Sequence, residues 1–152
     1  MIALASDHHG VALKQEMIRM LDEMGLAWKD FGSDGADNRN DDYPVYGYRA
    51  ALAVASGECD RGILICGTGM GISIAAGKVK GIRVCACSDV YSAEMSRRHN
   101  DSNMLALGAL VVGTEKAKMI VRRWLAAGFE GGRHQRRIDM IGKIENGQAP
   151  DI

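Results

Sequence analysis

The stretch that most constrains the fold lies at residues 61–76, with the sequence RGILICGTGMGISIAA. The apolar run Ile63–Ile65 ends at Cys66, three glycines follow at alternate positions, and a segment rich in Ala and Ile comes next. This pattern predicts a buried parallel strand, a tight loop and the start of a helix. Such a loop directs several backbone N–H groups toward one point, in front of the positive end of the helix dipole. We therefore expect an anion site with Cys66 at its edge, where a helix N-terminus favours a thiolate over a thiol.

Two nucleotide-binding motifs do not fit this loop. The dinucleotide motif G-x-G-x-x-G needs a third glycine where the chain has Ile72. A Walker A loop also fails, because Gly77-Lys78 is followed by Val79 instead of Ser or Thr. Two interpretations remain open at this point: a purely structural tight turn, or a site that holds an oxyanion beside a reactive thiol.

Length and charge narrow the class of protein. The 152 residues suffice for one domain with its own core. Lys+Arg and Asp+Glu both number 19, and a net charge of zero argues against a general nucleic-acid binder. No apolar run approaches the roughly 20 residues of a membrane span, and the start, Met1–Ala5 followed at once by Asp7, lacks the basic region of a signal peptide. We expect a cytoplasmic protein.

The cysteines do not suggest a metal site. In the cytoplasm the four cysteines are expected to be reduced. Cys85-Ala86-Cys87 does not have a zinc-ligand spacing, and it predicts a strand with one thiol on each face, both buried.

Strands and helices are expected to alternate along the chain. Apolar runs predict strands at residues 2–5, 27–31, 63–65, 81–88 and 105–113. Helical spacing and capping signals predict a first helix that ends before Gly25, helices at residues 44–55, 89–99 and about 130–146, one directly after the glycine loop, and one that carries Ala117 to Leu125. Alternation of this kind predicts a parallel sheet with helices on both faces.

The helical spacing also predicts which side chains face the sheet. The first helix is expected to bury Leu13, Met17, Met20, Leu21 and Met24. The second is expected to bury Val45, Tyr48, Leu52 and Ala55, and the fifth Ala117, Ile120, Val121, Trp124 and Leu125.

Ligands of such sheets bind outside the carboxyl ends of the strands. Three groups of reactive residues follow predicted strands directly: Asp7 and His8, the segment from Cys66 to Gly71, and Ser88 with Asp89. The polar loop of residues 32–43 precedes the second helix, and its aspartates (Asp34, Asp37, Asp41 and Asp42) are expected to be exposed.

Three motifs each allow a structural and a functional interpretation. Asp7-His8-His9 is either a helix N-cap with two incidental histidines or a carboxylate for sugar hydroxyls with an imidazole for phosphate. Arg97 and Arg98 suit a helix C-terminus, while His99-Asn100 suggests proton transfer near neutral pH. Arg133 and Arg137, four residues apart, form either a solvated basic face or a clamp on phosphate.

Together these residues meet the needs of one reaction class. Proton abstraction beside a sugar carbonyl requires a base, an acid for ring opening, donors for an enediolate oxygen and a cationic grip on a remote phosphate. Cys66, His99, the amides of Gly67–Gly71 and the Arg133/Arg137 pair supply these four functions.

At these positions the sequence resembles the ribose-5-phosphate isomerase B family, which includes the galactose-6-phosphate isomerase subunits. The matching segments are residues 6–10 (SDHHG), 42–44 (DYP), 62–76, 91–93 (YSA), 98–101 (RHND) and 130–134 (EGGRH). The resemblance implies a Rossmann-like three-layer α/β/α sandwich with a five-stranded parallel sheet. It also implies an aldose–ketose isomerase of sugar phosphates that uses no metal or other cofactor.

The resemblance also implies residue roles. Cys66 would move a proton between C1 and C2; family members that lack this cysteine use a glutamate further along, where this chain has Ala75 or a neighbour without a carboxylate. Thr68 would assist proton transfer among the oxygens, and His99, with Asp7, would open the sugar ring. The amides of Gly67, Gly69, Met70 and Gly71 would hold the enediolate; His8, Arg133 and Arg137 would bind phosphate; Tyr43 and Asn100 would contact hydroxyls.

The family is dimeric, sometimes pairing again into tetramers, and each pocket is completed by the partner subunit. The final helix, about residues 130–146, is therefore expected to pack on a partner, within a single domain of residues 1–152. Ribose 5-phosphate is the first-choice substrate; allose 6-phosphate, galactose 6-phosphate, a tetrulose 4-phosphate and a non-catalytic phosphosugar-binding module remain alternatives. His9 stands where the family often has a small or apolar residue. A thiol redox protein is disfavoured, because the chain has no C-x-x-C motif.

Overall fold

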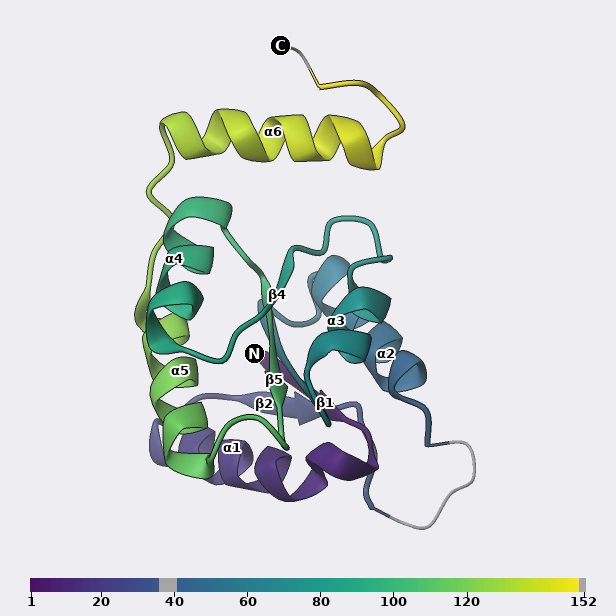
Figure 1. Cartoon of the computed structure of the whole chain (residues 1–152), viewed down its shortest axis with the longest axis vertical. Coiled ribbons are helices and arrows are strands. Elements are labelled where there is room, and N and C mark those ends of the chain that lie inside the picture. The colour runs from purple at the N-terminus through teal and green to yellow at the C-terminus, as the bar shows by residue number, and fades with distance from the viewer. Residues whose placement is uncertain (36–40, 151–152) are drawn as a thin grey trace.

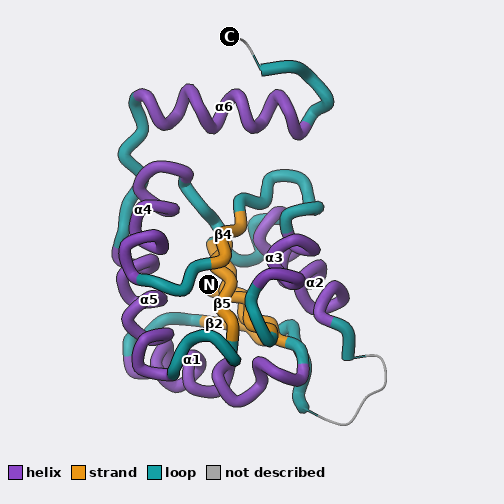
Figure 2. Tube along the Cα trace, in the orientation of Figure 1, coloured by secondary structure: helices purple, strands orange, loops and turns teal. Residues whose placement is uncertain are grey.

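The computed structural model describes residues 1–35 and 41–150 as a parallel sheet between two layers of helices. The strands are β1 (Ile2–Ser6), β2 (Trp28–Asp30), β3 (Arg61–Cys66), β4 (Val84–Ala86) and β5 (Met104–Gly108). They pair in the order β2-β1-β3-β5-β4, all parallel. Figure 2 shows the strands at the centre of the molecule with helices on both sides. The predicted α/β sandwich with a five-stranded parallel sheet is confirmed.

The helices alternate with the strands. They are α1 (Val11–Glu23), α2 (Tyr43–Ala55), α3 (Met70–Ala76), α4 (Val90–Asn100), α5 (Thr114–Ala126) and α6 (Arg133–Glu145), with a short 3₁₀ turn, η1, at His8–Gly10. α1, α4 and α5 cover one face of the sheet, and α2 and α3 cover the other (Figure 1).

The strands alternate between two hydrophobic cores because successive side chains point to opposite faces. In β1, Ile2 and Leu4 join the core under α1 and α5, while Ala3 and Ala5 join the core under α2 and α3. Cys66 belongs to the second core, together with Ile72 of α3. The side chain of Cys66, at the end of β3, therefore lies on the face of the sheet that α2 and α3 cover.

Two predicted strands were too long. β4 covers only Val84–Ala86 of the predicted 81–88, and β5 ends at Gly108, whereas the prediction ran to 113. Residues 109–112 form a tight turn, in which the N–H groups of Val111 and Val112 both donate to the carbonyl of Gly108. Apolar content alone does not separate such a turn from a strand.

The predicted inward face of α2 was wrong. Val45, Tyr48 and Leu52 are 41%, 53% and 43% exposed, and Ala55 is exposed as well. The buried side is made of other residues, several of them small: Tyr46, Gly47, Ala50, Ala51, Ala53 and Val54. α2 carries apolar residues on two faces, and the face with smaller side chains packs against the sheet.

Three further expectations need correction. Cys85 and Cys87 lie on the same face of the sheet, against the core under α1 and α5, because residues two apart in a strand share a face. In the loop before α2, Asp41 is buried, although an exposed loop was expected; Asp37 lies outside the described residues. Met24, at the end of α1, is 40% exposed.

The last helix packs at one end of the molecule, where Glu145 accepts from the N–H of Gly81. Figure 1 shows α6 at one end of the molecule, beyond α4 and far from η1 and the start of α1. Ile141 and Ile144 of this helix are 47% and 57% exposed. Within the described ranges, no helix has the length and apolar character needed to cross a membrane.

Candidate active site

The glycine loop after β3 holds Cys66 against a backbone amide. The N–H of Gly69 donates to Cys66 Sγ at 3.1 Å, and Cys66 is 4% exposed. Gly69 has φ +79°, in the left-handed region that favours glycine, and a Cβ there would lie 2.9 Å from the carbonyl carbon of Leu107. The loop therefore takes this shape only with glycine at position 69.

The other three thiols differ from Cys66 in their surroundings. Burial raises the pKa values of Cys59 and Cys85, and it raises the pKa of Cys87 to about 12. All four cysteines are free thiols. Among them, Cys66 is the one that terminates a strand at the predicted anion loop.

Asp7 and the two histidines lie beside this loop. Asp7 is 4% exposed and accepts from the N–H groups of His9 and Gly10, so the predicted capping role is real. Its other oxygen lies 3.8 Å from His9 Nδ1. His8 Nδ1 lies 3.9 Å from Asp41 Oδ2, and the rings of His8 and His9 are 4.0 Å apart. Each of the two imidazoles thus has a carboxylate oxygen within 4.0 Å of its Nδ1.

Close contacts join these residues to the loop. A Cβ placed on Gly71 would lie 2.6 Å from the ring of Tyr43, and one placed on Gly67 would lie 3.8 Å from the ring of His9. Thr68 Oγ1 accepts from the N–H of Met70 at 3.3 Å. A first group of predicted site residues therefore lies together at the carboxyl ends of the strands. This group consists of Asp7, His8, Tyr43, Cys66, Gly67, Thr68, Gly69, Met70 and Gly71. Asp89 lies at the start of α4 and caps it by accepting from the N–H of Ser92.

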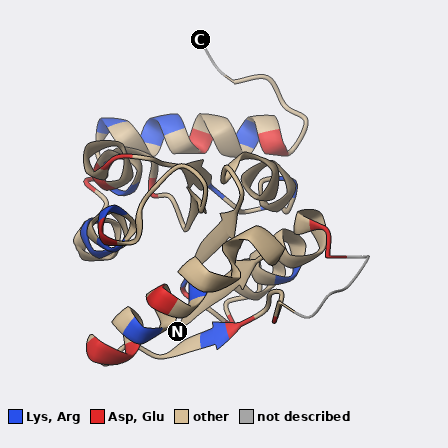
Figure 3. Cartoon of the chain, turned by 60° about the horizontal axis from the view of Figure 1, so that its bottom comes forward, with Lys and Arg blue, Asp and Glu red and all other residues tan. Residues whose placement is uncertain are grey.

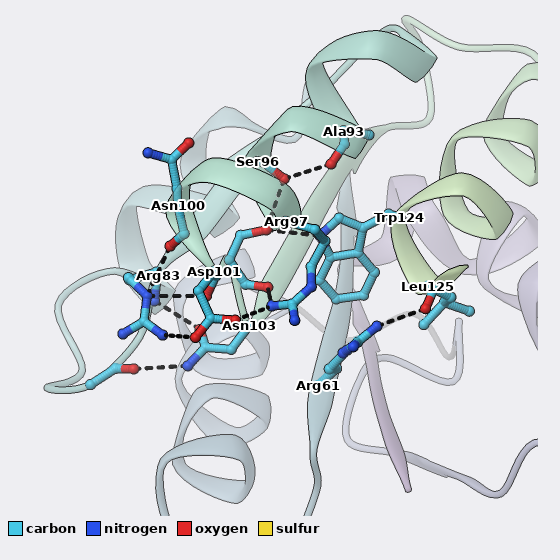
Figure 4. Close-up of polar contacts among 12 residues, drawn as sticks. Arg61, Arg83, Ala93, Ser96, Arg97, Asn100, Asp101, Asn103, Trp124 and Leu125 are labelled. Atoms are coloured by element: carbon cyan, nitrogen blue, oxygen red, sulfur yellow. Dashed lines mark hydrogen bonds and ion pairs between the residues drawn. The ribbon is translucent and has the colours of Figure 1, made fainter. Parts of the chain in front are cut away.

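The remaining predicted site residues lie at the opposite end of the sheet, where the strands begin. α4 runs back from Asp89 toward the beginnings of the strands, so its last residues, His99 and Asn100, lie near the start of β4. Arg83, just before β4, donates to the backbone carbonyls of Asn100 and Asp101 (Figure 4). The strands extend about 13 Å between the two edges, at about 3.3 Å per residue. His99, Asn100, Arg133 and Arg137 therefore form a second group that does not meet Cys66 within one chain.

A hydrogen-bonded network fixes the end of α4. Arg97 and Arg83 both pair with the carboxylate of Asp101, which has φ +44°, and Ser96 and Trp124 share the hydroxyl of Ser102 (Figure 4). This network holds the backbone that carries His99 and Asn100.

His99 lies in a cluster with two residues of the final segment. Its ring stacks on that of His134 with centroids 4.2 Å apart, and Glu130 Oε2 lies 3.8 Å from His99 Nε2 and 3.6 Å from His134 Nε2. Burial, then the neighbouring His99 and Arg133, lower the pKa of His134. The hydrogen bond from Arg98 lowers the pKa of Glu130.

Two clusters in the described residues have metal-ligating atoms within 4.8 Å of one another: Asp7 with His8 and His9, and His99 with Glu130 and His134. At the second cluster Arg98 donates to Glu130 Oε1 at 2.7 Å, and the exposed Arg133 and Arg137 lie on the adjoining helix. Figure 3 shows basic residues along α6. The positive charges of these arginines favour an anionic ligand at this end of the sheet.

Three residues near the candidate site had no role assigned from the sequence. Glu130 and His134 stand in the matching segment 130–134, so their place in that motif was the available signal. Asp41 carried no such signal, because an aspartate in a polar loop is usually exposed.

Comparisons with known proteins bear on this arrangement. A family model described as Ribose/Galactose Isomerase matches residues 2–141. The chain belongs to this family. The prediction made from the sequence segments is thereby confirmed.

Relatives of this isomerase family align over nearly the whole chain. Ribose-5-phosphate isomerase B of Escherichia coli (strain K12) is 55% identical, with 95% of each chain covered. D-erythrulose-4-phosphate isomerase of Pectobacterium atrosepticum is 41% identical, again with 95% of each covered.

Solved structures agree with the fold. Ribose-5-phosphate isomerase B of Clostridium thermocellum superposes with a TM-score of 0.93 at 53% identity, covering 96% of this chain and 97% of that one. The enzyme of Mycoplasma genitalium, solved with bound ribulose-5-phosphate, superposes with a TM-score of 0.89 at 40% identity, with 95% of each covered.

Proposed function

We propose that the chain interconverts ribose 5-phosphate and ribulose 5-phosphate as an aldose–ketose isomerase. The observation that carries this proposal is the Cys66 sulfur held by the Gly69 amide at the tip of a glycine loop, in a chain of the ribose/galactose isomerase family. The names of the relatives support ribose 5-phosphate as the substrate.

In the proposed reaction the Cys66 thiolate removes the proton from C2 of the open-chain aldose. The electrons of that C–H bond form the C1–C2 double bond of a cis-enediolate, and the carbonyl oxygen at C1 takes the negative charge. Those amides of residues 67–71 that are not bonded to Cys66 Sγ or Thr68 Oγ1 donate to this oxygen, which they stabilise more strongly than the neutral carbonyl. Thr68 assists proton transfer between the two oxygens, and the Cys66 thiol returns its proton to C1 to give the ketose.

Ring opening and the phosphate grip require a second chain. His99 and Cys66 lie at opposite edges of one sheet, about 13 Å apart along the strands, so one subunit does not bring them together. We therefore propose a homodimer in which His99 of the partner subunit opens the sugar ring with Asp7 near the ring oxygen. The exposed apolar residues of α2, together with the exposed Ile141 and Ile144 of α6, support such an interface.

The rest of the site follows from the same dimer. We propose that the phosphate lies between His8 and the pair Arg133 and Arg137 of the partner subunit, whose planar guanidinium groups suit phosphate oxygens. Tyr43 and Asn100 of the partner subunit contact sugar hydroxyls. The reaction as proposed needs no metal or other cofactor and takes place in the cytoplasm; pairing of dimers into tetramers is an extension of the same proposal.

A second candidate substrate is a four-carbon sugar phosphate. The D-erythrulose-4-phosphate isomerase of Pectobacterium atrosepticum supports it at 41% identity. Allose 6-phosphate, galactose 6-phosphate and a non-catalytic phosphosugar-binding role are further alternatives. A panel of four-, five- and six-carbon aldose phosphates, ranked by kcat/KM, separates these substrates.

The experiment that tests the proposal uses three preparations. Cys66→Ala and His99→Ala are each expected to abolish isomerisation and exchange of solvent deuterium into C2. Co-expression of the two variants yields mixed dimers that retain one intact site, and about a quarter of wild-type activity is expected from a random assortment of subunits. Activity in Cys66→Ala alone contradicts the role of the thiol, and no recovery in the mixture contradicts the shared site.

A further inference from the structure

Asp41 is a buried carboxylate in a loop that was expected to be exposed. Its side chain is 5% exposed, and its Oδ2 accepts from the hydroxyl of Ser33 at 2.8 Å. Its Oδ1 has no hydrogen-bond partner in the described part of the chain. Burying an ionised carboxylate is costly unless a cation or several donors compensate for it.

Neutral donors and one basic side chain surround the carboxylate of Asp41 in the described part of the chain. Ser33 is neutral, and burial together with the hydrogen bond to Asp41 raises the pKa of Tyr46, so this phenol is neutral too. Among residues 1–35 and 41–150, the basic side chain within 4.0 Å of the carboxylate is His8, whose Nδ1 lies 3.9 Å from Oδ2. The carboxylate thus faces Nδ1 of His8.

A second buried charge fixes Ser33, which donates the hydrogen bond to Asp41. Lys14 of α1 is 0% exposed, and its Nζ donates to Asp30 Oδ1 at 2.8 Å and to the carbonyl of Ser33 at 2.6 Å. The N–H of Ser33 also donates to the carbonyl of Ser6, the last residue of β1. Ser33 is therefore held at both backbone groups, and its hydroxyl in turn holds Asp41 facing His8.

The position of His8 makes this arrangement relevant to a ligand. Its side chain is 57% exposed, and the side facing Asp41 is that of Nδ1. Nε2 is therefore the nitrogen left available to a ligand. Which ring nitrogen carries a proton is set by what the other one faces, and a protonated imidazole gives a charge-assisted hydrogen bond to phosphate.

We propose that Asp41 is a positioning residue that orients His8 for binding the substrate phosphate. This inference rests on the proposed function. Asp41 does not touch the sugar; it acts through His8 alone. Asp41 lies outside the sequence segments that match the family.

The test compares Asp41→Asn with the adjacent Asp42→Asn in the full-length protein. Asp42 is exposed and its side chain makes no capping hydrogen bond, so the control makes the same charge change outside the network. Asp41→Asn is expected to raise KM and the inhibition constant of inorganic phosphate by roughly five- to tenfold, the loss of one charge-assisted hydrogen bond. Its kcat is expected to stay within about twofold of wild type, and Asp42→Asn is expected to leave both constants unchanged.

A double-mutant cycle with His8→Asn separates positioning from general loop damage. In the His8→Asn background, Asp41→Asn is expected to cause no further rise in KM, because the residue through which it acts is absent. An equal rise in both backgrounds overturns the proposal, as does an unchanged KM in Asp41→Asn. Wild-type turnover of ribose 5-phosphate is measured first; its absence overturns the proposed function, whereas turnover with an unaffected Asp41→Asn overturns only this inference.

A spectroscopic measurement covers the case in which Asp41→Asn does not fold. ¹⁵N spectra of the labelled wild-type protein distinguish protonated from bare ring nitrogens. Nδ1 of His8 is expected to carry the N–H that faces Asp41, and addition of inorganic phosphate is expected to shift the Nε2 signal. A bare Nδ1 overturns the proposal.

Discussion

Replacement of Gly108 by alanine tests how tightly the sheet fixes the catalytic loop. Gly108 ends β5, pairs with Cys66 and lies under the backbone of Thr68. A Cβ at this position would lie 2.7 Å from both the carbonyl carbon and the carbonyl oxygen of Thr68. Since these are backbone atoms, no rotation of a side chain relieves the overlap, and the loop itself has to move.

The size of this movement sets the expected effect. Carbon atoms pack at about 3.5 Å, so the backbone of Thr68 has to retreat by about 0.8 Å. A misplacement near 1 Å costs a reaction on the order of 100-fold, and overpacking costs roughly 1–3 kcal/mol of stability. We expect kcat for ribose 5-phosphate to fall about 10- to 100-fold, with a folded protein of reduced Tm.

Steady-state isomerisation and thermal melting of Gly108→Ala check this expectation. Gly128→Ala serves as the matched control, because a Cβ at Gly128 has no atom within 4 Å. The control is expected to match wild type in both measurements. A Gly108→Ala enzyme with wild-type kcat refutes the reasoning that β5 fixes the loop to a fraction of an ångström.

Three further outcomes are expected. A thiol-alkylating reagent near pH 8 labels Cys87 more slowly in the folded protein than in the urea-unfolded chain, by peptide mass spectrometry, because burial raises the pKa of this thiol to about 12; equal labelling rates contradict this. The folded-state pKa of His134 is lowered, so the unfolded chain binds more protons and stability falls as pH drops below about 6.5; His134→Gln loses less Tm than wild type between pH 7 and pH 5, and an equal loss refutes the assignment. Trp124→Phe removes the indole N–H that donates to Ser102 Oγ at 2.8 Å and lowers the unfolding free energy by about 1–3 kcal/mol in a urea titration, where no change tells against that bond.

Much of the fold follows from periodicity. The alternation of apolar runs and helical segments predicts the parallel sheet, because buried parallel strands are apolar throughout and their connections need helices. Periodicity did not predict which face of α2 packs on the sheet. The residues of α2 that face the sheet are mainly small, whereas the larger Val45, Tyr48 and Leu52 point outward. Helical spacing identifies the apolar faces of a helix, but when there are two it does not tell which of them packs against the sheet.

The sequence predicted the individual residues of the candidate site better than it predicted which of them lie together. Residues that follow strands, such as Asp7 and Cys66, meet at one edge because all strands run the same way. His99 follows a helix that returns to the other edge, so the same topological rule places it away from Cys66. Asp41 was missed because its burial depends on contacts with Ser33 and His8, which are distant from it in sequence.

The order of the strands has a consequence for synthesis of the chain. β5 lies between β3 and β4 although it is made after both. Until residues 104–108 emerge from the ribosome, β3 presents an open backbone edge and β4 has no neighbour, and such edges pair readily with other chains. At about 5–20 residues per second this exposure lasts a few seconds. A product truncated before β5 would keep that edge open permanently, which makes incomplete chains the most aggregation-prone form of this protein.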